Sequence, residues 1–134
     1  MQYHTMERMT AAGRSEWVFE EKEVTLLATS MLLVRIMIGK VEKKDRLEST
    51  LHKVPIRQGQ MGWNCVGWVK EALEALNADG KALGTSVTEW QAVRDGAMQY
   101  AQRKKAEHRF DGRGNFNMRY AATYDLLDGK ETVP

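Results

Sequence analysis

One amphipathic stretch, Asn64 to Asn77, constrains the fold of this chain most strongly. Its apolar side chains recur at the spacing of a single helix face. They are Cys65, Trp68, Val69, Ala72, Leu73 and Leu76. Asn64 is a favourable N-cap residue, and the pair Asp79-Gly80 is typical of a helix end. The pattern therefore predicts a helix at 64–77 that buries one face, with Cys65 in its first turn.

Two further helices are predicted from their caps and apolar spacing. Asp45 is a plausible N-cap for a short helix at 45–54, whose inward residues are Leu47, Leu51 and Val54. Thr88-Glu89-Trp90-Gln91 has the form of a capping box and opens a long helix at 88–108. The inner face of that helix consists of Trp90, Val93, Ala97, Tyr100 and Ala101. The basic residues 103–105 suit its C-terminal end.

The first third of the chain is expected to form strands. Residues 3–7 and 16–24 are strand candidates, and residues 9–15 have turn composition. Segment 31–41 fits either a strand, through its branched residues, or a buried helix; we take a strand. The tail, 109–134, reads as loop-rich, and residues 124–127 could dock as a last turn.

This order of strands followed by helices predicts an α+β fold. We expect a single domain over residues 1–134, because that length can bury one core. Its small antiparallel sheet, from residues 1–41, would be packed by the two long helices at 64–77 and 88–108. The apolar fraction of 43% and the charged fraction of 28% are those of an ordinary globular protein.

Composition excludes several classes of function. A net charge of +2 is too small to argue for nucleic acid or a membrane surface. The single cysteine excludes an internal disulfide framework. The first residues lack a signal-peptide pattern, and the apolar stretch 24–38 is too short and too polar to span a bilayer, which needs about 20 apolar residues. A cytoplasmic location is the resulting expectation.

Neither a metal nor another cofactor is expected. One cysteine and three scattered histidines give none of the usual metal-ligand spacings. No glycine-rich phosphate-binding motif is present either.

Cys65 is the candidate for chemistry. A helix N-terminus has unpaired N–H groups and a partial positive charge, and both favour the nucleophilic thiolate. The glycine-bearing loop 59–62 before it could let a substrate approach. The alternative is that Cys65 is a small core residue on an apolar helix face. A nucleophilic cysteine also needs a base, and the candidates are His4, His52 and His108. Trp63, which precedes the Asn64-Cys65 pair, could form the wall of a cleft.

The motif Asn64-Cys65-x-x-Trp68-Val69 at the start of an amphipathic helix resembles that of lecithin:retinol acyltransferase-like proteins, a permuted papain-like group within the NlpC/P60 superfamily. The resemblance covers about residues 3–76. It implies that Cys65 is a nucleophile and that a histidine upstream on the sheet acts with it. His4 is the residue that this order of elements offers.

The chain also looks like a family of small fungal proteins of unknown function, through segments 15–21, 62–65 and 108–112. Longer members of that family carry an additional N-terminal strand pair with a His-Trp motif. That likeness implies that His4 matches the second, orienting histidine and that the position of the primary base is missing here. A sheet without those strands has an unpaired edge, which would favour a homodimer.

Two classes of function are therefore expected. The first is a thiol-dependent hydrolase or acyltransferase acting on an amide or ester of a small-molecule, acyl or peptide substrate. In it Cys65 is the nucleophile, His4 the base or orienting group, and Asn64 with nearby N–H groups stabilises the oxyanion. The second is a non-catalytic, dimeric binding module in which Cys65 only packs. Apart from these two classes, the sequence leaves a third alternative, a small-molecule-binding or isomerising protein of secondary metabolism. Its apolar ligand would lie in a cleft between Trp63 and Trp68, and Cys65 would only line that cleft.

Overall fold

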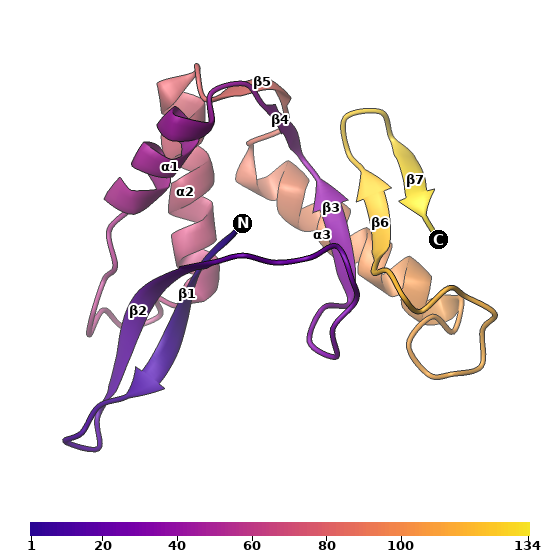
Figure 1. The fold of residues 1–134 in the computed structure, drawn as a ribbon, viewed down its shortest axis with the longest axis horizontal. Coiled ribbons are helices and arrows are strands. Elements are labelled where there is room, and N and C mark those ends of the chain that lie inside the picture. The colour runs from indigo at the N-terminus through magenta and orange to yellow at the C-terminus, as the bar shows by residue number, and fades with distance from the viewer. The chain divides into compact units, whose positions relative to one another are not determined.

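The computed structural model describes residues 1–134, and the chain forms two compact units, each built from two segments. Unit 1 comprises Met1–Val24 and Val41–Leu83, and unit 2 comprises Thr25–Lys40 and Gly84–Pro134. Strands β4 (Gly39–Val41) and β5 (Leu83–Ser86) pair with each other where the chain passes from one unit to the other. Three helices and several small sheets (Figure 1) confirm the predicted α+β class.

Unit 1 begins with an antiparallel hairpin of β1 (Gln2–Met9) and β2 (Ser15–Lys22), as the sequence predicts. Gly13, with φ 76°, makes the turn between them in a left-handed conformation that suits glycine. In the register of the hairpin, Thr5 lies opposite Phe19 and His4 lies opposite Glu20. Directly opposed residues share a face of the sheet, and successive residues alternate between faces. The hairpin therefore has one face with Tyr3, Thr5 and Phe19 and another with His4 and Glu20.

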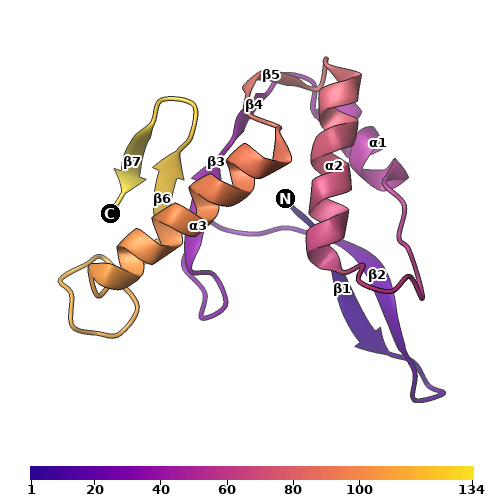
Figure 2. The same ribbon diagram turned by 180° about the vertical axis from the view of Figure 1, so that it is seen from behind.

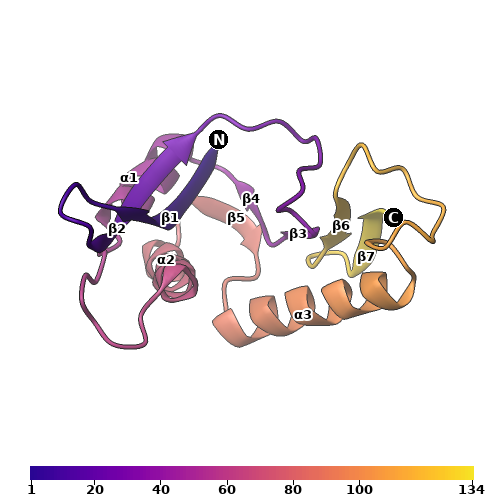
Figure 3. The ribbon, with the colours of Figure 1, turned by 90° about the horizontal axis from the view of Figure 1, so that it is seen from below.

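The core of unit 1 lies between the hairpin and the helices α1 (Lys44–Lys53) and α2 (Cys65–Asp79). Its buried cluster is Leu51, Val54, Trp68, Ala72, Leu76 and Ala82, and Tyr3 and Phe19 of the hairpin pack against it. Figure 3 shows α2 nearly end-on, on one side of the hairpin. The predicted inward stripe of α2 is confirmed for Trp68, Ala72, Leu73 and Leu76. Cys65 and Val69, at the edge of that stripe, are instead exposed.

The predicted N-cap residue is confirmed for α2, whereas the N-caps of α1 and α3 lie at other residues than the sequence predicts. Asn64 caps α2, and Gly80 ends it at φ 65°. The N-cap of α1 is Lys43, without a side-chain cap bond, so the prediction of Asp45 as N-cap is wrong. Asp45 lies in the first turn, where its charge suits the helix dipole. For α3 (Trp90–Ala106) the N-cap is Glu89, whose carboxylate accepts hydrogen bonds from the amides of residues 91 and 92.

Unit 2 contains a three-stranded sheet that the sequence only partly predicts. β3 (Val34–Met37) runs parallel to β6 (Ala122–Asp125), which pairs antiparallel with β7 (Lys130–Val133). Figure 2, with Figure 3, shows α3 along one face of this sheet. The expected strand at 31–41 is split into β3 and β4, and the expected loop-rich tail contains β6 and β7. Each of these strands is four residues or shorter, too short for a clear alternating pattern.

A buried ionic cluster fastens α3 to β7. Lys104 is 1% exposed, and its Nζ lies 2.9 Å from Glu131 Oε2 and 2.6 Å from Glu107 Oε2. The Tyr100 hydroxyl donates to the same Glu131 oxygen at 2.7 Å. Burial would raise the pKa of Glu131, but Lys104 and Tyr100 outweigh it and hold that pKa below its usual value. Lys104 is therefore a core residue of unit 2, although the basic residues 103–105 indicated only a helix C-terminus.

Arg109 is a second buried cation, at 3% exposure. Its guanidinium donates to the backbone oxygens of Asn117, Tyr120 and Pro134. These bonds hold the loop after α3 and the end of β7 together.

No helix of the structure is both long enough and apolar enough to cross a membrane.

Candidate functional site

Cys65 is the first residue of α2, and its side chain is exposed. The Asn64 side-chain oxygen accepts from the amides of Val66 at 3.0 Å and Gly67 at 3.3 Å. The Trp68 amide donates to the Asn64 carbonyl. The amide of Cys65 itself is the one first-turn N–H without a hydrogen-bond partner. No acidic residue lies in this turn. The Cys65 thiol and the unpaired N–H of the same residue therefore lie next to each other, at the positive end of a 15-residue helix.

The loop that precedes Cys65 is anchored at its start, by Arg57 and Gln58. The Gln58 side chain accepts from the backbone N–H of Trp17 at 2.9 Å and donates to the Trp17 carbonyl. Arg57 binds Glu71 of α2 through two nitrogens, at 2.9 and 2.6 Å. The bond with Arg57 is the main reason that the pKa of Glu71 is lowered. These contacts tie the loop to β2 and to α2, so the position of Cys65 is set by unit 1 as a whole.

The two candidate substrate-binding tryptophans have different surroundings. Trp63 is half-buried: its ring meets Trp17 edge-on at 5.7 Å, and its Nε1 donates to Glu71 at 3.1 Å. Trp68 is 3% exposed and belongs to the core, with its ring 5.7 Å from that of Phe19. Trp68 therefore does not line an open cleft, whereas the half-buried Trp63 packs against Trp17 and Glu71.

His4 lies on the face of the hairpin that does not pack against the core of unit 1. Its Nε2 pairs with the Glu20 carboxylate across the strands, and its Nδ1 lies 3.3 Å from the Gln2 amide. This pairing is the main cause of the lowered pKa of Glu20. Both ring nitrogens thus have partners, and none of the hydrogen bonds of His4 reaches Cys65. Tyr3 and Thr5, on either side of His4, face the core instead.

The other two histidines are also engaged elsewhere. His52 of α1 pairs with Glu21 at 3.0 Å, and its ring lies against Phe19. His108, at φ 63°, pairs with Asp111 at 2.7 Å in the loop after α3. No group of histidine, cysteine and acidic side chains is arranged to hold a metal ion.

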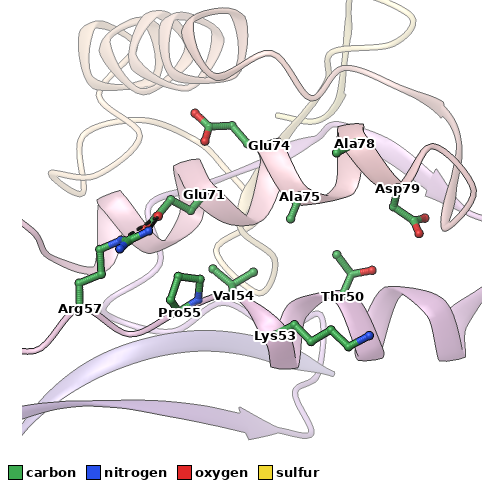
Figure 4. A pocket seen from close by; sticks show the side chains of 10 residues that line it. All are labelled: Thr50, Lys53, Val54, Pro55, Arg57, Glu71, Glu74, Ala75, Ala78 and Asp79. Atoms are coloured by element: carbon green, nitrogen blue, oxygen red, sulfur yellow. Dashed lines mark hydrogen bonds and ion pairs between the residues drawn. The ribbon is translucent and has the colours of Figure 1, made fainter.

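Sequence reasoning missed an open groove of about 580 Å³ in unit 1, along α1 and α2. Figure 4 shows Val54, Pro55 and Ala75 between the two helices and the Arg57–Glu71 ion pair at one end. A second ion pair, Arg46–Asp79 at 2.5 Å, lies toward the other end. The only sequence signal for the groove is the presence of small residues on the sides of α1 and α2 that line it. This signal does not distinguish an open groove, because small residues are equally common where two helices pack closely.

Comparison with known proteins identifies the family. A model described as "Family of unknown function (DUF6914)" matches residues 1–133. The chain belongs to this family. Because the match spans nearly the whole chain, both units described above are part of the DUF6914 unit of homology. No curated protein and no solved structure matches the chain.

Proposed function

We propose that this DUF6914 protein is a thiol-dependent hydrolase or acyltransferase, with Cys65 as its nucleophile. The observation that carries the proposal is the exposed Cys65 thiol next to its own unengaged amide at the start of α2. The likeness of Asn64-Cys65-x-x-Trp68-Val69 to the lecithin:retinol acyltransferase motif supports it as an analogy. The anchored loop also favours a preorganised site, because the thiol is placed by rigid elements.

The chemistry needs only groups at this helix start. The Cys65 thiolate attacks the carbonyl carbon of an ester, forming a C–S bond, and the Cys65 amide faces the developing oxyanion. The ester C–O bond then breaks, and the alkoxide takes a proton from water. Water, or a second alcohol, removes the acyl group from sulfur. Since His4 is held by Glu20 and Gln2, it has no direct part in this scheme, and solvent takes the thiol proton.

The test exploits the fact that Cys65 is the only cysteine. Iodoacetamide should alkylate Cys65 at least about tenfold faster in the folded protein than in the same protein unfolded in urea at the same pH. p-Nitrophenyl acetate should also leave an acetyl group on Cys65, detected by mass spectrometry. Equal or slower alkylation in the folded state would refute an activated thiol and with it the proposed enzyme.

Asn64 offers a matched pair of variants for this test. Asn64→Ser keeps a capping oxygen, whereas Asn64→Asp keeps the cap and adds a negative charge beside the thiol. Alkylation should be several-fold slower in Asn64→Asp than in Asn64→Ser, because the added carboxylate disfavours the thiolate. Circular dichroism should show the same helix content in both.

A non-catalytic dimer is the second candidate, and the engagement of His4 by Glu20 favours it. β1 pairs with β2 alone, so its other edge has no strand. Unpaired edges of this kind favour pairing with a second chain. If two β1 strands pair antiparallel about a two-fold axis, Met6 lies at or near that axis.

Met6→Asp should then convert the dimer to a monomer in light scattering, because two carboxylates would meet there. Val18→Asp, opposite Met6 on β2 and therefore not on the pairing strand, should leave the dimer intact. A wild-type protein that is monomeric at high concentration would exclude this candidate.

A further inference from the structure

Two loops of unit 2 lie side by side. The amide of Ala28 donates to the carbonyl of Arg119 at 2.8 Å, and Leu27 forms an isolated antiparallel bridge with Tyr120. Arg35 fastens the first loop further, because its guanidinium donates to the carbonyls of Leu26 and Thr25. Segments 25–33 and 112–120, together with the Arg35 side chain that is bound to the first of them, therefore form one continuous surface, which we call the loop surface.

The loop surface exposes an unusual number of large apolar side chains. Met31 is 91% exposed and Leu26 is 72% exposed. The other exposed members are Leu27, Leu33, Met118 and Tyr120. Single exposed apolar residues need no explanation, but a group of this size on adjoining segments indicates an interaction site.

The charges on the loop surface are all of one sign. No aspartate or glutamate occurs at 24–40 or at 112–124. Arg35 binds only backbone carbonyls, Arg119 lies over the ring of Tyr120, and Arg113 makes no ion pair, so none of the three is neutralised by a carboxylate. This local excess of positive charge is hidden in the overall net charge of +2.

We infer that the loop surface docks on an anionic lipid bilayer. Exposed leucine and methionine side chains can enter the interfacial region of a bilayer, while arginines beside them attract acidic headgroups. A protein partner with an apolar patch would match the leucines and methionines but would leave three unpaired arginines at the contact. A bilayer containing acidic lipids matches both features. The docking is peripheral.

The test is co-sedimentation of the full chain with vesicles of phosphatidylcholine and phosphatidylserine, and with vesicles of phosphatidylcholine alone. The protein should bind the acidic vesicles more tightly, and added salt should weaken that binding. Met31→Asp should weaken it by about tenfold or more, because one inserted side chain is lost and a negative charge is gained. Arg119→Gln should weaken it several-fold.

Met61→Asp provides the matched control. Met61 is 98% exposed and belongs to unit 1, so its substitution changes the net charge equally but leaves every residue of the loop surface unchanged. Its vesicle binding should equal that of the wild type. Absence of binding to acidic vesicles, or equal losses in both methionine variants, would overturn the inference. So would a concentration-dependent dimer that Met31→Asp abolishes, because the loop surface would then be covered by a second copy.

Discussion

Replacing Lys104 with methionine should destabilise unit 2 by about 3 kcal/mol, although lysines are usually surface residues. The substitution removes the ammonium that lies between Glu131 and Glu107 in a site that is 1% exposed. The Glu131 carboxylate would then remain largely buried, with only Tyr100 and the more distant Arg103, at 3.4 Å, as partners. Removing one partner of a buried ion pair is costly because the other charge loses its compensation.

Hydrogen exchange of the α3 amides, with urea unfolding, measures this loss. Lys105→Met, at the exposed neighbouring position, should change stability by less than about 0.5 kcal/mol. The double variant Lys104→Met with Glu131→Gln should recover part of the loss, since it leaves no uncompensated charge. Similar exchange rates in Lys104→Met and Lys105→Met would show that the buried cluster contributes nothing to stability.

The same cluster should make unit 2 sensitive to acid. The pKa values of Glu131 and Glu107 are lowered in the folded state, so these carboxylates stabilise the fold at pH values above their ordinary pKa of 4.5. That stabilisation is lost as the pH falls below 4.5 and through the lowered folded values. In Lys104→Met the loss of stability between neutral pH and about pH 3 should be smaller than in the wild type.

Trp68→Ala should destabilise unit 1 by about 3 to 5 kcal/mol. The side chain is 3% exposed and fills the space between α2 and Phe19 of the hairpin, so its removal leaves a cavity in the buried cluster. Trp68→Phe should cost far less, about 1 kcal/mol. The smaller ring keeps most of the packing, and the variant also removes the indole N–H, which is buried without a hydrogen-bond partner.

Urea unfolding followed by far-ultraviolet circular dichroism distinguishes these two variants. Val69→Ala, one residue along at an exposed position, is the control and should change stability only slightly. If Trp68→Phe were as damaging as Trp68→Ala, the indole N–H would have a partner after all. Because Trp68 lies one turn after Cys65, loss of its packing should also slow the alkylation of Cys65 in Trp68→Ala more than in Trp68→Phe.

The candidate site was only partly predictable. Asn64 as N-cap and Cys65 in the first turn follow from residues within four positions of each other. The sequence could not predict which face of the hairpin carries His4. Strand alternation places His4 and Tyr3 on opposite faces, but it does not decide which of the two faces packs against the core. The loop surface was hidden for a similar reason: its two segments are nearly 80 residues apart in the sequence, and the net charge averages over the whole chain.

By itself, the sequence determined the elements whose signals are local. The β1–β2 hairpin, with its turn at Gly13, and helix α2, from its Asn64 cap to its Gly80 end, depend on neighbours a few residues away. Tertiary structure alone decided which of their side chains are covered. Cys65 is exposed although it belongs to an apolar stripe, and Lys104 is buried although it belongs to a basic cluster. Burial depends on what packs from elsewhere, and the carboxylate that makes a buried lysine stable, that of Glu131, lies 27 residues further along the chain.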